Sequence, residues 1–154
     1  MAETKVAAHG EPLGAAQIAD ASHRCARGGY ELIATERPAQ VTLFASGSEL
    51  MIAVAAQRLL VERDISTRVV SVPSLDLLLA QPEQVRKAII GTAPVMIAVE
   101  AAVRFGWDAV VGPDGGFIGM SGFGGSAPAQ HLYRHFGITA EAVVAMAMDR
   151  LAGR

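Results

Sequence analysis

The sequence predicts an α/β fold of three layers, in which a mostly parallel sheet of about five strands lies between helices on both faces. Short apolar runs without polar alternation are typical of strands that are buried on both faces. These runs alternate with stretches of helical periodicity, and Gly, Pro and Ser residues separate the two kinds of segment. The expected strands are residues 30–35, 41–45, 68–72, 95–99 and 117–120.

The strand at residues 30–35 is followed by the next one after a connection too short for a crossover helix, so we expect it to pair antiparallel at an edge of the sheet. Residues that favour helix ends define the helices. Ser46 and Glu49 have the spacing of a capping box, Ser74 and Thr139 are expected N-caps, and Gly137 ends a helix. The expected helices run from the Ser46 turn to about residue 62, then over residues 74–79, 82–89, 126–136 and 140–151.

Composition excludes several classes of protein. The chain is 51% apolar and 18% charged, with a formal net charge of -2 and no run of lysine or arginine. Nucleic acid and anionic membranes are therefore not expected as partners. No apolar run approaches the roughly 20 residues of a membrane helix. The single cysteine, Cys25, can form neither an intramolecular disulfide nor a cysteine metal cluster, and we expect a cytoplasmic protein.

Two regions differ in character along the chain. Residues 1–27 are rich in small and polar types, which predicts a linker or N-terminal arm with a helical turn near residues 15–19. Residues 28–154 are expected to form one domain.

The turn Ser46-Gly47-Ser48 is the candidate anion site, because it joins a buried strand to a helix. Free amides at a helix N-terminus attract anions, and glycine lets a ligand approach the backbone. The alternative is that these residues only make the turn and cap the helix.

Two further patterns are weaker evidence of a binding site. Residues 122–127 match the G-x-G-x-x-A dinucleotide pattern, but Pro128 interrupts the helix start and no acidic residue follows at the required place. His131 and His135 have a spacing that can bind zinc, yet no third ligand is evident. We therefore predict a packed loop and a helix surface, and no metal site.

Acidic residues follow the expected strands. Glu100 comes directly after the run at 95–99, and Asp76 and Asp114 lie near the same kind of edge, where α/β folds place functional groups. A loop or interface hydrogen bond explains a carboxylate there equally well. No nucleophile with a base at a recognisable spacing is present.

Several segments, in order, resemble the C-terminal domain of transketolases, over about residues 28–151. They are residues 28–32 (GGYEL), 41–49 (VTLFASGSE), 68–74 (RVVSVPS) with 81–83 (QPE), 99–101 (VEA) before 105–107 (FGW), and 118–128 (IGMSGFGGSAP) with 136–139 (FGIT).

The resemblance implies a part in the transfer of a two-carbon ketol unit between sugar phosphates. The complete enzyme uses thiamine diphosphate and magnesium, which belong to a diphosphate-binding and a pyrimidine-binding domain. This third domain packs on the middle domain and joins the homodimer. No catalytic, cofactor-binding or metal-ligating residue carries over, so the isolated chain is expected to be inactive and to need those two domains as partners.

The resemblance places Glu100, Phe123, Ser126 and Pro128 nearest an interdomain interface. Two alternatives stay open. One is a free-standing module that binds a small anion or has a regulatory role. The other is the equivalent domain of a deoxyxylulose-phosphate synthase or a 2-oxo acid dehydrogenase β-subunit, against which the segment at residues 123–128 argues.

Overall fold

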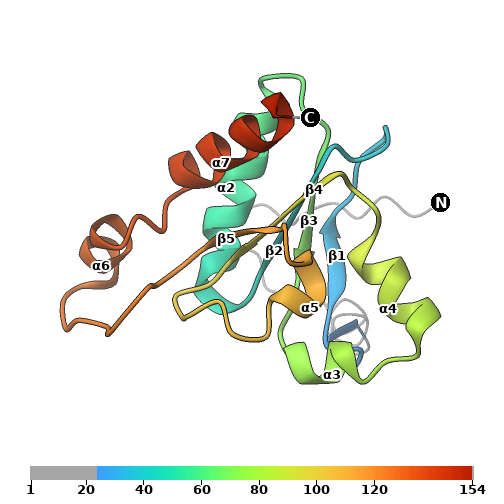
Figure 1. Ribbon diagram of the computed structural model, residues 1–154, viewed down its shortest axis with the longest axis horizontal. Helices are drawn as coiled ribbons and strands as arrows, with labels where there is room; N and C mark the ends of the chain where they lie inside the picture. Colours follow the sequence, from blue (N-terminus) through green and yellow to red (C-terminus); the bar gives the residue numbers. More distant parts are fainter. Residues whose placement is uncertain (1–23, 154) are drawn as a thin grey trace, which may run out of the picture.

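The computed structural model describes residues 24–153, which form a five-stranded sheet in the order β1-β3-β2-β4-β5 (Figure 1). Neighbouring strands pair in parallel except β1, which pairs antiparallel with β3 at one edge. The mixed sheet with one antiparallel edge strand confirms the prediction. The strands are β1 (Tyr30–Ile33), β2 (Val41–Ala45), β3 (Thr67–Ser71), β4 (Val95–Val99) and β5 (Gly116–Ile118).

Helices cover both faces of the sheet, as expected for a three-layer sandwich (Figure 1). On one face, Leu43 of β2 packs in a core that includes buried residues of α2 and α7. On the other face, Phe44 packs with residues of α3 and α5 and with the partly buried end of α4. Adjacent residues of β2 thus enter two cores, which explains its unbroken apolar pattern. The helical elements are η1 (Gly47–Glu49), α2 (Leu50–Val61), α3 (Leu75–Leu79), α4 (Glu83–Ile90), α5 (Asp108–Val111), α6 (Ala129–His135) and α7 (Ala140–Ala152).

The order of the strands creates a topological switch point between β2 and β4. From β2 the chain crosses to β3 on one side and later returns to β4 on the other. Ala45 and Val99, the last residues of β2 and β4, are register partners. Ser46 and Glu100 therefore leave the sheet side by side, at the position where open α/β sheets bind ligands.

Both edges of the sheet are short. β1 has four residues and its pairing with β3 shifts register between Glu31 and Ile33. β5 has three residues.

Gly28 lies where the backbone of α3 approaches the start of β1. Its φ is +78°, and its carbonyl accepts a hydrogen bond from the amide of Ser74 at 3.1 Å. A Cβ atom at this position would lie 2.5 Å from the Ser74 oxygen and 2.6 Å from the Leu77 carbonyl carbon. The contact requires glycine both for its conformation and for its size.

Several predicted helix ends are confirmed. Ser74 accepts from the amide of Leu77 at 3.4 Å, and Thr139 accepts from that of Ala142 at 3.2 Å. Gly137 follows α6 with a φ of +68°.

Two helix predictions need correction, and one prediction falls outside the described residues. The helix expected from residue 126 begins only at Ala129, with Pro128 as its N-cap, because a proline disfavours the helical conformation in the residue before it. The four-residue helix α5 was not expected. The helical turn near residues 15–19 lies outside the described part of the chain. Among the helices of residues 24–153, none is long and apolar enough to cross a membrane.

Candidate functional site

A cluster of polar side chains occupies the switch point, at the carboxyl ends of β2 and β4. The Ser46 hydroxyl donates a hydrogen bond to Oε2 of Glu100 at 2.5 Å, joining two residues that are 54 apart in sequence. The parallel register of β2 and β4 brings them together. The sequence placed Ser46 and Glu100 separately at strand ends, and the fold makes them one site.

The second half of the cluster is centred on Glu49, which is only 4% exposed. Its Oε1 atom accepts from the Ser48 hydroxyl at 3.1 Å and also from the Tyr133 hydroxyl of α6. The Tyr133 oxygen lies 2.8 Å from that of Ser48. Two elements, η1 and α6, therefore meet at one carboxylate.

The capping-box prediction for Ser46 and Glu49 was wrong. The Ser46 side chain makes no cap hydrogen bond, and the chain begins with the 3₁₀ turn η1 before α2 starts at Leu50. The serine hydroxyl and the glutamate carboxylate are instead used by Glu100 and Tyr133. These long-range partners replace the local ones that the spacing suggested.

The electrostatics of the cluster are those of crowded, partly desolvated acidic groups. Burial raises the pKa of Glu100, the hydrogen bond from Ser46 lowers it, and the charge of Glu49 raises it further. Burial and the contact with Glu49 also raise the pKa of Tyr133. The cluster is therefore a region of negative potential, which suits a cation or a hydrogen-bond donor better than an anion.

Beside the cluster, an apolar cavity of about 210 Å³ lies beneath α6. Tyr133 lines it together with Ala101, Met120, Leu132 and Phe136. None of the residues of α6 is fully buried. The helix is thus held mainly by its partly buried side chains and by the Tyr133 hydroxyl.

The structure does not bring the other candidates into this cluster. Phe123, Ser126 and Pro128 lie in the exposed segment between β5 and α6, and Phe123 is 99% exposed. Asp76 lies in the first turn of α3, and Asp114 lies in the loop before β5.

The glycine-rich and histidine patterns are also separate from the cluster. Residues 122–127 form a loop before α6, but all six are exposed, so the prediction of a packed loop was wrong. His131 and His135 both lie on α6. The His135 ring packs edge-on against the Phe136 ring, with 4.9 Å between the ring centroids. Within residues 24–153, no three His, Cys, Asp or Glu side chains group in a way that could hold a metal ion.

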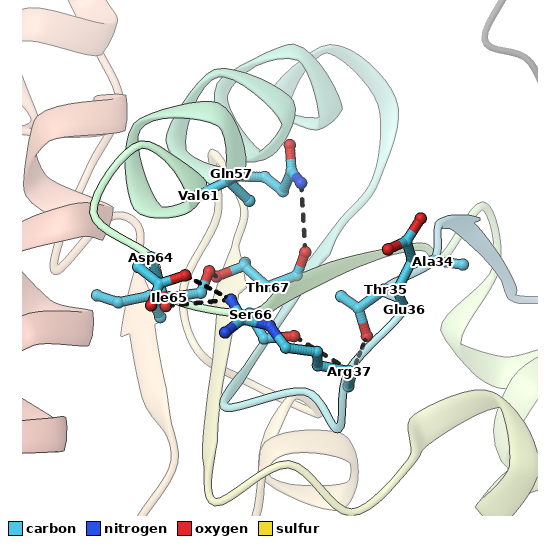
Figure 2. Close-up of a pocket in the computed structure, with 10 residues that line it drawn as sticks. All are labelled: Ala34, Thr35, Glu36, Arg37, Gln57, Val61, Asp64, Ile65, Ser66 and Thr67. Atoms are coloured by element: carbon cyan, nitrogen blue, oxygen red, sulfur yellow. Dashed lines mark hydrogen bonds and ion pairs between the residues drawn. The ribbon is translucent and has the colours of Figure 1, made fainter.

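A polar pocket of about 320 Å³ lies at the opposite end of the sheet, between the segment after β1, α2 and the start of β3 (Figure 2). The Arg37 guanidinium crosses it to reach Asp64 at 2.7 Å, and both side chains are largely exposed. Gln57 closes another side by donating to the Thr67 carbonyl at 3.4 Å. This open pocket lies at the edge that α/β folds do not use for ligands, and its only positive side chain among the described residues, Arg37, is already paired with Asp64, so it is a weaker candidate than the switch point.

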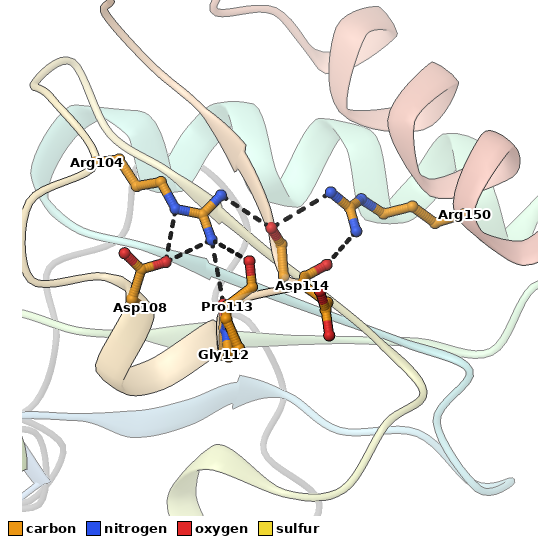
Figure 3. Close-up of polar contacts among 7 residues, drawn as sticks. Arg104, Asp108, Gly112, Pro113, Asp114 and Arg150 are labelled. Carbon is orange, nitrogen blue, oxygen red and sulfur yellow. Dashed lines mark hydrogen bonds and ion pairs between the residues drawn. The ribbon is translucent and has the colours of Figure 1, made fainter.

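Two arginines position β5 and thereby the segment that follows it (Figure 3). Arg104 donates to the carbonyl oxygens of Gly112 and Gly115 at 3.1 and 3.0 Å, and it pairs with Asp108. Arg150 of α7 donates to the carbonyls of Asp114 and Gly115. The loop before β5 is thus fixed from both sides, by Arg104 of the segment between β4 and α5 and by Arg150 of α7.

Tyr133 is the side chain of this cluster that sequence reasoning missed. It was visible only as one residue of a predicted helix, between two histidines that drew attention for their spacing. A tyrosine on a helix with few buried residues suggests that its hydroxyl binds another element. The sequence could not show which one, because the partner Glu49 lies 84 residues away.

Comparison with known proteins connects this site to one family. The model for the "Transketolase-like TK C-terminal domain" matches residues 28–139, which include the whole cluster. The chain belongs to the transketolase C-terminal domain family. The transketolase of Cereibacter sphaeroides is 51% identical over 126 residues, covering 82% of this chain and 19% of the relative. That of Sinorhizobium medicae is 49% identical over 130 residues, covering 84% and 19%.

Solved structures agree with this assignment. The transketolase from Leishmania mexicana superposes with a TM-score of 0.74 at 38% identity, covering 82% of this chain and 18% of that one. This chain therefore spans about a fifth of the length of the curated transketolases that it matches. The matches do not favour the binding module or the other thiamine enzymes considered as alternatives.

Proposed function

We propose that this chain acts as the C-terminal domain of a transketolase, where it stabilises interdomain and dimer packing and does not catalyse ketol transfer alone. The observation that carries the proposal is the family match over residues 28–139, in a chain equivalent to about a fifth of the relatives. The partners would be the diphosphate-binding and pyrimidine-binding domains. We also propose that residues 28–154 are the domain and residues 1–27 a linker or arm.

Exposed apolar side chains support a role in packing against other domains. Phe123 and Phe105 are 99% and 92% exposed, and Val103 is more than half exposed. Exposed apolar side chains of this size mark interaction surfaces when they gather together. Phe123, Ser126 and Pro128 stay our candidates for the interface, with Glu100 at its inner side.

Thiamine diphosphate and magnesium are expected in the complete enzyme, where the cofactor supplies the carbanion chemistry. The residues of the switch-point cluster do not fit this cofactor. Glu49 and Glu100 present carboxylates where a diphosphate would need amides or cations, and their charges would repel it. The same argument weakens the anion site proposed for Ser46, Gly47 and Ser48. We therefore propose that this chain alone binds neither the cofactor nor its metal.

A reconstitution experiment tests the proposal. The probe is the core chain, defined as the Cereibacter sphaeroides transketolase without the region that this protein matches. Turnover of xylulose 5-phosphate and ribose 5-phosphate would be measured with thiamine diphosphate and magnesium for each chain alone and for the mixture. We expect no turnover from this chain alone, and a gain in turnover, dimer fraction or thermal midpoint of the core chain in the mixture. Turnover by this chain alone, or a mixture identical to the core chain, would contradict the proposal.

A further inference from the structure

We infer that the carboxylates of Glu49 and Glu100 receive a cationic side chain, an arginine or a lysine, from the other transketolase domains. The switch-point cluster would then be the polar centre of the interdomain contact. The inference rests on the proposed function and adds the chemistry of the partner group that this surface recognises.

The first argument is an imbalance of charge. Glu49 is 4% exposed and Glu100 is about half-buried, and the charge of Glu49 is one of the causes that raise the pKa of Glu100. Ion pairs of the described chain join Arg37 to Asp64, Arg68 to Glu31, Lys87 to Glu83 and Arg104 to Asp108, and none includes either carboxylate. Carboxylates removed from water are normally paired with a cation. A cation supplied from outside residues 24–153 would restore this pairing.

The second argument is that one oxygen of each carboxylate is still free. Ser46 binds Oε2 of Glu100, whereas Ser48 and Tyr133 bind Oε1 of Glu49. Among the described residues, no side chain donates to Oε1 of Glu100 or to Oε2 of Glu49, and neither atom is sealed from solvent. The serine and tyrosine hydroxyls fix the orientation of both groups. The free oxygens can accept the planar donors of a guanidinium or the three donors of an ammonium group.

The third argument concerns the surface around the cluster. The hydrogen bond from the Met120 amide to the Ala102 carbonyl, 2.9 Å long, holds the segments after β4 and β5 together at the same end of the sheet. One residue beyond Ala102 is Val103, and three residues beyond Met120 is Phe123, both exposed. Residues that surround a strong contact in a protein interface exclude water from it, and a charge pair interacts more strongly when water is excluded. Glu100, Val103 and Phe123 therefore lie on segments that leave the sheet at the same end, as contact with one partner surface requires.

The test is a binding measurement with matched variants of the full 154-residue chain. The partner is the core chain, first shown to bind the C-terminal region of its own transketolase. Dissociation constants would be measured by calorimetry at low and at high salt for the wild type and for Glu100→Gln, which keeps the shape and removes the charge. Glu83→Gln is the matched control, since α4 lies on the far side of the molecule from α6 (Figure 1). Phe123→Ala reports on the apolar rim.

We expect Glu100→Gln to raise the dissociation constant at least about tenfold at low salt and to reduce its salt dependence, as loss of a desolvated charge partner does. Phe123→Ala should weaken binding while keeping the wild-type salt dependence, and Glu83→Gln should bind as the wild type does. If the wild type binds and Glu100→Gln binds equally well, the inference is overturned while the proposed function stands. If the wild type does not bind the core chain, both are overturned.

Discussion

Replacement of Gly28 by alanine tests the close approach of β1 and α3. An alanine would have to hold a φ of +78°, which costs roughly 1–2 kcal/mol for an L-residue. Its Cβ would also lie 2.5 Å from the Ser74 oxygen and against the Leu78 amide, so α3 would have to move. Displacement in a packed core adds roughly 1–3 kcal/mol. The sum, about 2–5 kcal/mol, is a large share of the roughly 5–15 kcal/mol that stabilises a typical domain.

The control for this prediction is Gly137→Ala. Gly137 has a similar φ of +68°, but a Cβ there would meet no atom within 4 Å. It should therefore lose only the conformational part, roughly 1–2 kcal/mol. Urea denaturation can follow the fluorescence of Trp107, the single tryptophan, which is buried in the core that α3 covers. Equal losses in the two variants would refute the steric argument and show that α3 adjusts without cost.

Three further predictions concern the cluster and the loop before β5. The pKa of Glu100 is raised in the folded state, so protonation of this carboxyl stabilises the fold below the pKa of the unfolded state, and this stabilisation is lost as pH rises through the folded pKa. Urea denaturation across this pH range should show the loss of unfolding free energy in the wild type and not in Glu100→Gln. Tyr133→Phe removes a hydrogen bond to a carboxylate that is worth roughly 1.5–3 kcal/mol, so amide hydrogen exchange in α6 should accelerate while exchange in α7 stays unchanged. The same exchange rate in α6 of the variant and the wild type would argue against the attachment of this helix through Tyr133. Arg104→Gln loses the hydrogen bonds to three loop carbonyls and should lower the thermal midpoint more than Asp108→Asn does, because the exposed ion pair that Asp108→Asn removes is worth less than about 1 kcal/mol. A larger loss in Asp108→Asn would refute the view that Arg104 fixes this loop.

The strands were predictable because their signal is local and strong. All five residues of β2 are buried, so an unbroken apolar run was sufficient to find it. The antiparallel edge strand followed from the short connection before residues 41–45. In contrast, α5 has only four residues, which is about one helical turn and too short to show a periodic pattern of apolar residues.

The candidate site was predictable only in part, because its contacts are long-range. The strand ends located Ser46 and Glu100 at the correct edge, but local spacing assigned Ser46 and Glu49 to each other as a capping box. In the fold, each takes a partner more than 50 residues away, Glu100 for one and Tyr133 for the other. A rule based on local spacing considers only nearby backbone amides as partners. It cannot include the Tyr133 hydroxyl, which comes close to Glu49 only in the folded structure.

The short edges of the sheet restrict how this protein can associate with others. A partner that adds its own strand needs a straight row of free backbone amides and carbonyls. β5 provides only three residues, and the shift of register in β1 interrupts the row at the other edge. Backbone annealing between copies, and with it the growth of ordered aggregates, is thereby disfavoured. Under the proposed function, recognition would fall to side chains at the carboxyl end of the sheet, where sequence changes can alter the choice of partner without altering the fold.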